Sequence, residues 1–200
     1  MPSAIDFYFD FSSPYGYFGS LEINQLAARH GRTVNWHPIL LGPIFKAVGT
    51  NPLVSTPLKG DYSRHDIERT ARFHNIFFQM PSRFPMGTQV AARATLWVQA
   101  QHPGQAVPFA QAIYSAFFTE DIDIGDAPTV VRIAGDLGID HAALSAALGE
   151  QAIKDQLKAA TEAAMQRGVF GSPFVIADGE SFWGFDRFAQ LDAFLKNGTI

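Results

Sequence analysis

The chain has 200 residues, of which 47% are hydrophobic and 17% charged, an ordinary globular composition with enough length to bury a core. Its formal net charge of −4 argues against a nucleic-acid-binding protein, because such proteins present clustered basic residues to phosphate. The sequence contains no cysteine, which excludes disulfides, thiolate metal sites and a cysteine nucleophile, so any thiol chemistry needs a thiol carried by a cofactor.

No segment has the pattern of a targeting or membrane-spanning sequence. Residues 1–11 lack the basic region and the apolar run of a signal peptide, and no stretch approaches the ~20 apolar residues of a membrane span. The 6 histidines are scattered, so we expect no metal site. A chain without cysteine loses nothing in a reducing compartment, and we therefore expect a cytoplasmic protein.

The first part of the sequence predicts a strand, a helix and a second strand. Residues 4–11 are rich in aromatic side chains and nearly alternate, which favours a strand whose odd-numbered side chains face one way. Ser13 is a good helix cap and Pro14 is favoured in a first turn, so a helix is expected over 14–30. Residues 33–40 form the second strand of a unit that usually begins a parallel pair.

The middle of the sequence contains almost no strand pattern. Glycine and proline punctuate residues 42–57, which predicts a short helix followed by a loop. Asp126 and Asp140 stand where helix N-caps are expected. Further helices are predicted over residues 61–75, 88–101, 108–119, 127–137, 141–148 and 150–167. This stretch therefore predicts a helical block.

Strand patterns return near the end of the sequence. A loop over 168–173 leads into a short apolar strand over 174–177, and the turn residues 178–180 lead into a strand over 181–184. An amphipathic helix is expected over 185–196. The order is that of an α/β, thioredoxin-like fold (β-α-β … β-β-α) with a large all-helical insertion. The expected domains are residues 1–45 together with 168–200, and the insertion over 46–167.

Two segments resemble motifs of one enzyme family. Residues 9–17, FDFSSPYGY, resemble the opening of the 2-hydroxychromene-2-carboxylate isomerase family and of its relatives, the kappa-class glutathione transferases. Residues 168–173, GVFGSP, followed by residues 182–187, FWGFDR, resemble the second signature of that family. The resemblance covers essentially the whole chain. It implies a DsbA-like, glutathione-dependent isomerase that interconverts 2-hydroxychromene-2-carboxylate and trans-o-hydroxybenzylidenepyruvate or a related aromatic compound, and it implies a homodimer.

Ser13 is the expected catalytic residue. In a redox protein of this fold, a Cys-Pro-X-Cys run opens the first helix, whose N-terminus stabilises a thiolate. The matching residues are Ser13, Pro14, Tyr15 and Gly16, so thiol-disulfide exchange is excluded. A serine hydroxyl at this helix end can donate a hydrogen bond to the glutathione thiolate and lower the pKa of that thiol. The alternative is that Ser13 is only a helix cap.

The resemblance places further glutathione contacts at the second signature. Ser172 precedes Pro173 where the thioredoxin fold carries a cis-proline, and it is expected to bind through its backbone, so that its side-chain type matters little. The alternative is an ordinary turn proline. The Asp186 carboxylate is expected to meet the ammonium group of the cofactor, and the alternative is a helix cap. The γ-glutamyl end of glutathione is assigned to Trp183, Gly184, Phe185 and Asp186, with no side-chain contact for Phe185.

The resemblance also implies a binding site for an aromatic substrate between the first loop and the helical block. Lys46 is the candidate cation for a substrate carboxylate, and Phe84 is the candidate apolar wall. The alternatives are a solvated lysine and a core phenylalanine. Two other functions stay open: a kappa-like glutathione transferase, in which the adduct is the product, and a non-redox thioredoxin-fold binding module.

Overall fold

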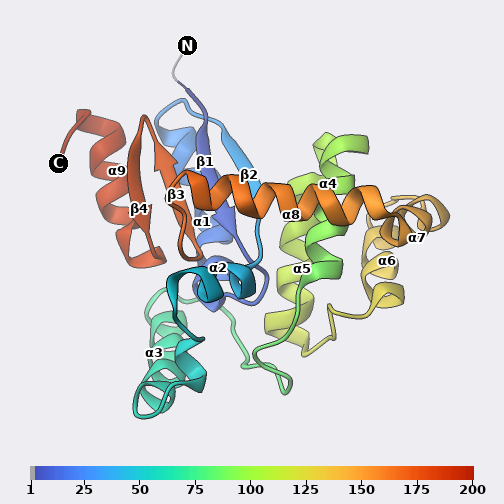
Figure 1. Ribbon diagram of the computed structural model, residues 1–200. Coiled ribbons are helices and arrows are strands. Elements are labelled where there is room, and N and C mark those ends of the chain that lie inside the picture. The colour runs from blue at the N-terminus through green and yellow to red at the C-terminus, as the bar shows by residue number, and fades with distance from the viewer. Residues whose placement is uncertain (1–2) are drawn as a thin grey trace.

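The computed structural model describes residues 3–200, and a 4-stranded sheet in the order β2-β1-β3-β4 lies at its centre (Figure 1). β1 (Ile5–Phe9) and β2 (Val34–Pro38) are parallel and are joined by α1 (Pro14–Arg29). β3 (Phe174–Ala177) runs antiparallel to β1, and β4 (Glu180–Trp183) runs antiparallel to β3. This arrangement confirms the predicted thioredoxin-like fold.

The aromatic side chains of β1 form the centre of the core. Phe7 pairs in register with Trp36 on β2 and with Val175 on β3, and its ring meets the Trp36 ring edge-on with centroids 4.9 Å apart. Phe7 and Phe9 are fully buried. Burial of such a side chain contributes about 1.5–3 kcal/mol, and the alternation of this strand places its odd-numbered side chains in one cluster, while Tyr8 on the opposite face packs in a second buried cluster with Ile39 and Ala164.

Helices fill the sequence between β2 and β3, as predicted. In Figure 1, α4 to α7 gather on one side of the sheet, α8 runs from that group back across β2, and α3 projects below. These helices are α2 (Leu41–Val48), α3 (Lys59–Phe73), α4 (Gln89–Gln101), α5 (Ala106–Glu120), α6 (Ala127–Asp136), α7 (His141–Gly149) and α8 (Gln151–Gln166), with short 3-10 turns at Leu53–Ser55 and Pro103–Gln105.

Local side-chain chemistry sets where several helices begin. Asp126 accepts a hydrogen bond from the Thr129 amide at 3.0 Å, and Asp140 accepts one from the Ala143 amide at 2.7 Å. Each bond satisfies an amide that has no partner within its own helix. Both predicted N-caps are therefore confirmed.

The C-terminal elements differ slightly from the predicted ones. Asp178 and Gly179 both have positive φ, 51° and 88°, which is the geometry of a tight two-residue hairpin turn, so β4 starts at Glu180 rather than after it. The last helix is divided: a 3-10 turn spans Phe185–Arg187, and α9 spans Phe188–Asn197.

One buried cluster joins the sheet to the helical block. It contains Phe9 and Phe18 together with Ile113, Tyr114 and Phe118 of α5, which packs against α1. The division into 1–45 plus 168–200 and 46–167 stays a prediction. Within residues 3–200, no helix combines the length and the apolar character needed to cross a membrane.

Candidate functional site

Ser13 lies at the N-terminus of α1 and makes two hydrogen bonds with its hydroxyl group. Its Oγ accepts from the Gly16 amide at 3.0 Å, which makes it the N-cap of the helix. The same Oγ donates to the carbonyl oxygen of Ser172 at 2.8 Å. Ser13 is therefore a cap, and its hydroxyl proton already has an acceptor within the chain. An external acceptor has to take that proton in place of the Ser172 carbonyl.

The Ser13–Ser172 hydrogen bond brings the two family-like motifs together across 159 positions of sequence. The Ser172–Pro173 peptide bond is cis, as expected. The expectation that the Ser172 side chain matters little is wrong, because its Oγ accepts from the amide of the buried Asp10 at 3.0 Å. A side chain without an acceptor at this position would leave that amide unpaired, which typically costs about 1–3 kcal/mol.

Tyr114 of α5 closes the site from behind. Its hydroxyl is buried, and it donates to the carbonyl oxygen of Asp10 at 3.0 Å. Burial raises the pKa of the Tyr114 hydroxyl well above its ordinary value, and the charge of Asp10 adds to the rise, so this group stays a neutral donor. Nothing in the α5 sequence distinguishes Tyr114 from a core aromatic, and sequence reasoning missed it.

Gly16 takes the place of the second cysteine of a redox motif, and the chain leaves no room for a side chain there. A Cβ built on Gly16 would lie 2.6 Å from Tyr114 Oη and 2.9 Å from Ser172 Oγ, well inside ordinary contact distance. Only glycine therefore fits at position 16 without displacing Tyr114 or Ser172.

Tyr15 connects the first turn of α1 to α3. Its hydroxyl donates to Asp66 Oδ2 at 2.5 Å, and Asp66 is also paired with Arg69. Burial and the Asp66 carboxylate raise the pKa of Tyr15, so it too is a neutral donor. The charge of Asp186 acts on the pKa of Tyr15 in the same direction.

The residues of the second signature gather next to Pro173. The Gly184 amide donates to the Pro173 carbonyl oxygen at 2.9 Å, and the exposed Trp183 ring stands edge-on to Phe170 with centroids 4.9 Å apart. The Trp183 indole also lies directly over Gly171, where any side chain would collide with it. These contacts form an open aromatic surface beside the Ser172–Pro173 bond.

Phe185 and Asp186 have different roles. The Phe185 side chain is buried and packs against the rings of His74 and Phe188, so only its backbone is available to a ligand. The Asp186 carboxylate is exposed, and Arg187 approaches it to 3.2 Å. Asp186 does not cap a helix, because the short turn begins after Gly184 and has no side-chain cap.

The two predicted substrate residues lie on separate elements. Lys46 is exposed on the last turn of α2. Phe84 is half-buried, and its ring centroid is 6.4 Å from that of Phe117 and 6.3 Å from that of Phe118. Phe84 therefore has the contacts of a core residue on one side and is partly exposed on the other.

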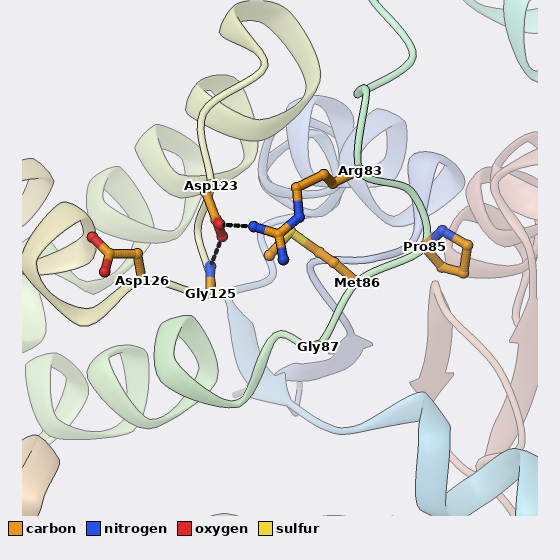
Figure 2. Close-up of a pocket in the computed structure, with 7 residues that line it drawn as sticks. All are labelled: Arg83, Pro85, Met86, Gly87, Asp123, Gly125 and Asp126. Atoms are coloured by element: carbon orange, nitrogen blue, oxygen red, sulfur yellow. Dashed lines mark hydrogen bonds and ion pairs between the residues drawn. The ribbon is translucent and has the colours of Figure 1, made fainter.

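A pocket of about 410 Å³ lies between the loop that carries Phe84 and the loop before α6 (Figure 2). In Figure 2, Arg83 reaches across it to Asp123, which also accepts from the Gly125 amide at 2.9 Å. The lining consists of Arg83, Pro85, Met86, Gly87, Asp123, Gly125 and Asp126. Among the described residues, no hydrogen bond joins this lining to Ser13 or Ser172, and Arg83 is already paired with Asp123. The pocket is therefore separate from the Ser13–Ser172 hydrogen bond.

Comparison with known proteins agrees with the fold. A family model described as a DSBA-like thioredoxin domain matches residues 4–196. The 2-hydroxychromene-2-carboxylate isomerase of Sphingobium xenophagum is 32% identical over 199 residues, covering 98% of this chain and 99% of that protein. Glutathione S-transferase kappa 1 of Homo sapiens is 26% identical over 207 residues, covering 96% of this chain and 90% of that protein.

A solved structure of 2-hydroxychromene-2-carboxylate isomerase superposes with a TM-score of 0.86 and 27% identity, covering 96% of this chain and 94% of that one. The fold and the cysteine-free helix start define a thioredoxin-fold protein that does not exchange disulfides. The chain belongs to the DsbA-like thioredoxin family and, within it, to the 2-hydroxychromene-2-carboxylate isomerases. It is accordingly an enzyme of the isomerase class.

Proposed function

We propose that this enzyme is a glutathione-dependent isomerase of 2-hydroxychromene-2-carboxylate or a related aromatic compound, with Ser13 as the group that stabilises the glutathione thiolate. The observation that carries the proposal is the Ser13 hydroxyl, held at a helix N-terminus next to the Ser172–Pro173 bond in a chain with no cysteine of its own. A positive helix end and a hydroxyl donor together favour an anionic sulfur.

The residues present have the chemistry that glutathione needs. An O–H donor suits the thiolate, the open surface of Trp183 over Gly171 suits an extended peptide, and the exposed Asp186 carboxylate suits the ammonium group. When bound, glutathione supplies a thiol that adds reversibly to a carbon conjugated with a carbonyl group, which allows rotation about the former double bond before the thiol leaves unchanged.

Ser13 contributes by redirecting one hydrogen bond. Its hydroxyl gives up the Ser172 carbonyl and donates towards the cofactor, while its Oγ continues to accept from the Gly16 amide. A preorganised donor of this kind acts without reorganising solvent when charge develops. Ser13 is not itself proposed as a nucleophile.

For the substrate we propose Lys46 as the cation that meets the carboxylate and Phe84 as an apolar wall. Both are accessible, and the α2 helix that carries Lys46 begins at Leu41, whose amide donates to Asp10 in the loop before Ser13. Lys46→Met should raise the KM for the aromatic acid more than the KM for glutathione.

We also propose a cytoplasmic homodimer. Several large apolar side chains are exposed between the end of α2 and the segment after α3, and exposed apolar surface favours a protein partner. The exposed residues are Val48, Leu53, Leu58, Tyr62, Phe73 and Phe77. Light scattering on a size-exclusion column tests the dimer, and a monomer at micromolar concentration would contradict it.

The deciding experiment counts glutathione during turnover. An isomerase forms many product molecules while the glutathione concentration stays constant, whereas a transferase consumes one glutathione for each product. The transferase is the second candidate, because human glutathione S-transferase kappa 1 is similar over nearly the whole chain. If titration calorimetry gives no heat at millimolar glutathione, both glutathione-dependent proposals fail.

A further inference from the structure

Asp10 is a buried carboxylate to which the proposed mechanism gives no role. It follows β1 directly and is 3% exposed. Its Oδ1 accepts from the Ser12 amide at 2.8 Å, from Ser12 Oγ at 2.9 Å and from Thr88 Oγ1 at 2.8 Å. Its Oδ2 accepts from the Leu41 amide at 2.6 Å. Every partner of this carboxylate donates to it.

The donors to Asp10 come from the beginnings of three helices. Ser12 precedes the cap of α1, Leu41 is the first residue of α2, and Thr88 is the cap position of α4. Helix N-termini carry partial positive charge, so a carboxylate placed between them is stabilised. Charge-assisted hydrogen bonds are also stronger and more directional than neutral ones. The Asp10 side chain thus fixes the start of α1, which belongs to the sheet unit, relative to the starts of α2 and α4 in the helical block. These elements occupy different parts of Figure 1.

The backbone of Asp10 holds the groups that surround Ser13. Its amide donates to Ser172 Oγ at 3.0 Å, and its carbonyl oxygen accepts from the Ser13 amide at 2.9 Å and from the Tyr114 hydroxyl at 3.0 Å. The Asp10 backbone is therefore hydrogen-bonded to Ser13, to Ser172 and to Tyr114.

We infer that Asp10 is a positioning residue that sets the place of the Ser13 hydroxyl relative to α2 and α4. The inference rests on the proposed function for its catalytic consequence, since Ser13 serves the thiolate of glutathione. Asp10 acts through Ser12 and Ser13 on one side and through Leu41 and Thr88 on the other. It keeps the thiol-binding helix and the helix that carries the substrate cation in one arrangement.

Two effects of Asp10 on a bound thiol have opposite signs and can be separated. As a bare negative charge, Asp10 disfavours a nearby thiolate, so its removal would lower the pKa of the thiol. As a positioning residue, Asp10 keeps the Ser13 donor aimed at the sulfur, so its removal would raise that pKa. If Asp10 were needed only for folding, its removal would leave the thiol pKa unchanged once the variant has folded.

The test compares Asp10→Asn with Asp140→Asn. In Asp10→Asn an amide nitrogen faces a donor whichever way the side chain turns, towards Leu41 or towards Ser12 and Thr88. We expect kcat to fall by about 10- to 100-fold, as for a misplaced reacting group, with a smaller change in the KM for glutathione. The pKa of bound glutathione, followed by thiolate absorbance, should rise. Asp140→Asn makes the same substitution at the exposed start of α7 and should change neither value.

A lowered or unchanged thiol pKa in Asp10→Asn, or a kcat equal to that of Asp140→Asn, would overturn the inference. If Asp10→Asn fails to fold, Thr88→Val removes one donor to Oδ1 and should give a smaller change with the same sign.

Amide hydrogen exchange tests, without glutathione, the claim that Asp10 fixes the starts of the helices around it. Exchange at the Ser12 and Leu41 amides should be faster in Asp10→Asn or Thr88→Val than in the unmodified enzyme, and unchanged rates at both amides would contradict this claim. Absence of glutathione binding to the unmodified enzyme would refute the proposed function alone.

Discussion

Gly16→Ala tests whether the space behind Ser13 is as tightly filled as the structure indicates. The new Cβ would lie 2.6 Å from Tyr114 Oη, 2.9 Å from Ser172 Oγ and 3.1 Å from Ser13 Cβ. Both oxygens are held by hydrogen bonds to the backbone of Asp10, so neither can retreat without breaking one. Overpacking of a core costs about 1–3 kcal/mol, and a lost buried hydrogen bond costs about 1–3 kcal/mol more. Replacing glycine by alanine within a helix returns about 1 kcal/mol, which leaves a net loss of roughly 1–5 kcal/mol.

Urea unfolding measures this loss, and two further variants make the assignment specific. Gly42→Ala is the matched control, because a Cβ at that helical glycine meets nothing within 4 Å and should not destabilise the enzyme. Tyr114→Phe removes the closer oxygen, so the double variant with Gly16→Ala should lose less than the sum of the two single losses, by about 0.5–3 kcal/mol. Additive losses, or a Gly16→Ala variant as stable as the unmodified enzyme, would refute the reasoning.

Three further changes test separate parts of the account. Asp186→Asn should weaken glutathione binding about tenfold in calorimetry because a charge-assisted contact is lost, with little change in unfolding free energy at this exposed site. Asp126→Ala should cost about 1 kcal/mol as a lost helix cap and leave turnover intact, and a loss of turnover would move the chemistry to the pocket of Figure 2. Hydrogen bonds from Arg32 and Ser3 hold the pKa of Asp178 below its ordinary value of 3.8, so their stabilisation is present above that value and is lost as pH falls through the lowered pKa. The difference in unfolding free energy between Asp178→Asn and the unmodified enzyme should therefore shrink in acid, and a constant difference would contradict this.

The fold could be predicted because each element carries a local signal. Alternation marks β1, and the caps Asp126 and Asp140 mark two helices. The last helix is the instructive difference. Its amphipathic pattern begins at Phe185, but Gly184 has φ 102° and the first turn closes as a 3-10 turn, a distinction that periodicity over a few residues does not resolve.

Much less of the site could be predicted. Ser13 and the cis Ser172–Pro173 bond are assigned from motifs, whereas Asp10 lies within the motif at residues 9–17 but the motif gives it no role, and Tyr114 lies outside both motifs. Their key hydrogen bonds join residues 78 and 104 positions apart, and contacts over such distances leave no periodic trace in one sequence. Asp10 also falls at the end of an aromatic strand pattern, where a polar residue indicates only the solvent side of a strand. In the structure it is buried because three helices begin around it.

The pKa of the bound glutathione thiol, measured in the unmodified enzyme and in Ser13→Ala, tests the central claim most directly. Ser20→Ala is the matched control, since Ser20 is also a buried serine of α1 but its hydroxyl donates to the Tyr17 carbonyl of its own helix. We expect a thiol pKa below that of free glutathione in the unmodified enzyme and in Ser20→Ala, and a value returned towards that of free glutathione in Ser13→Ala. Turnover of Ser13→Ala should fall about 100-fold, against a stability loss of about 0.5–2 kcal/mol for the lost cap. An unchanged thiol pKa in Ser13→Ala would mean that Ser13 is a helix cap and nothing more.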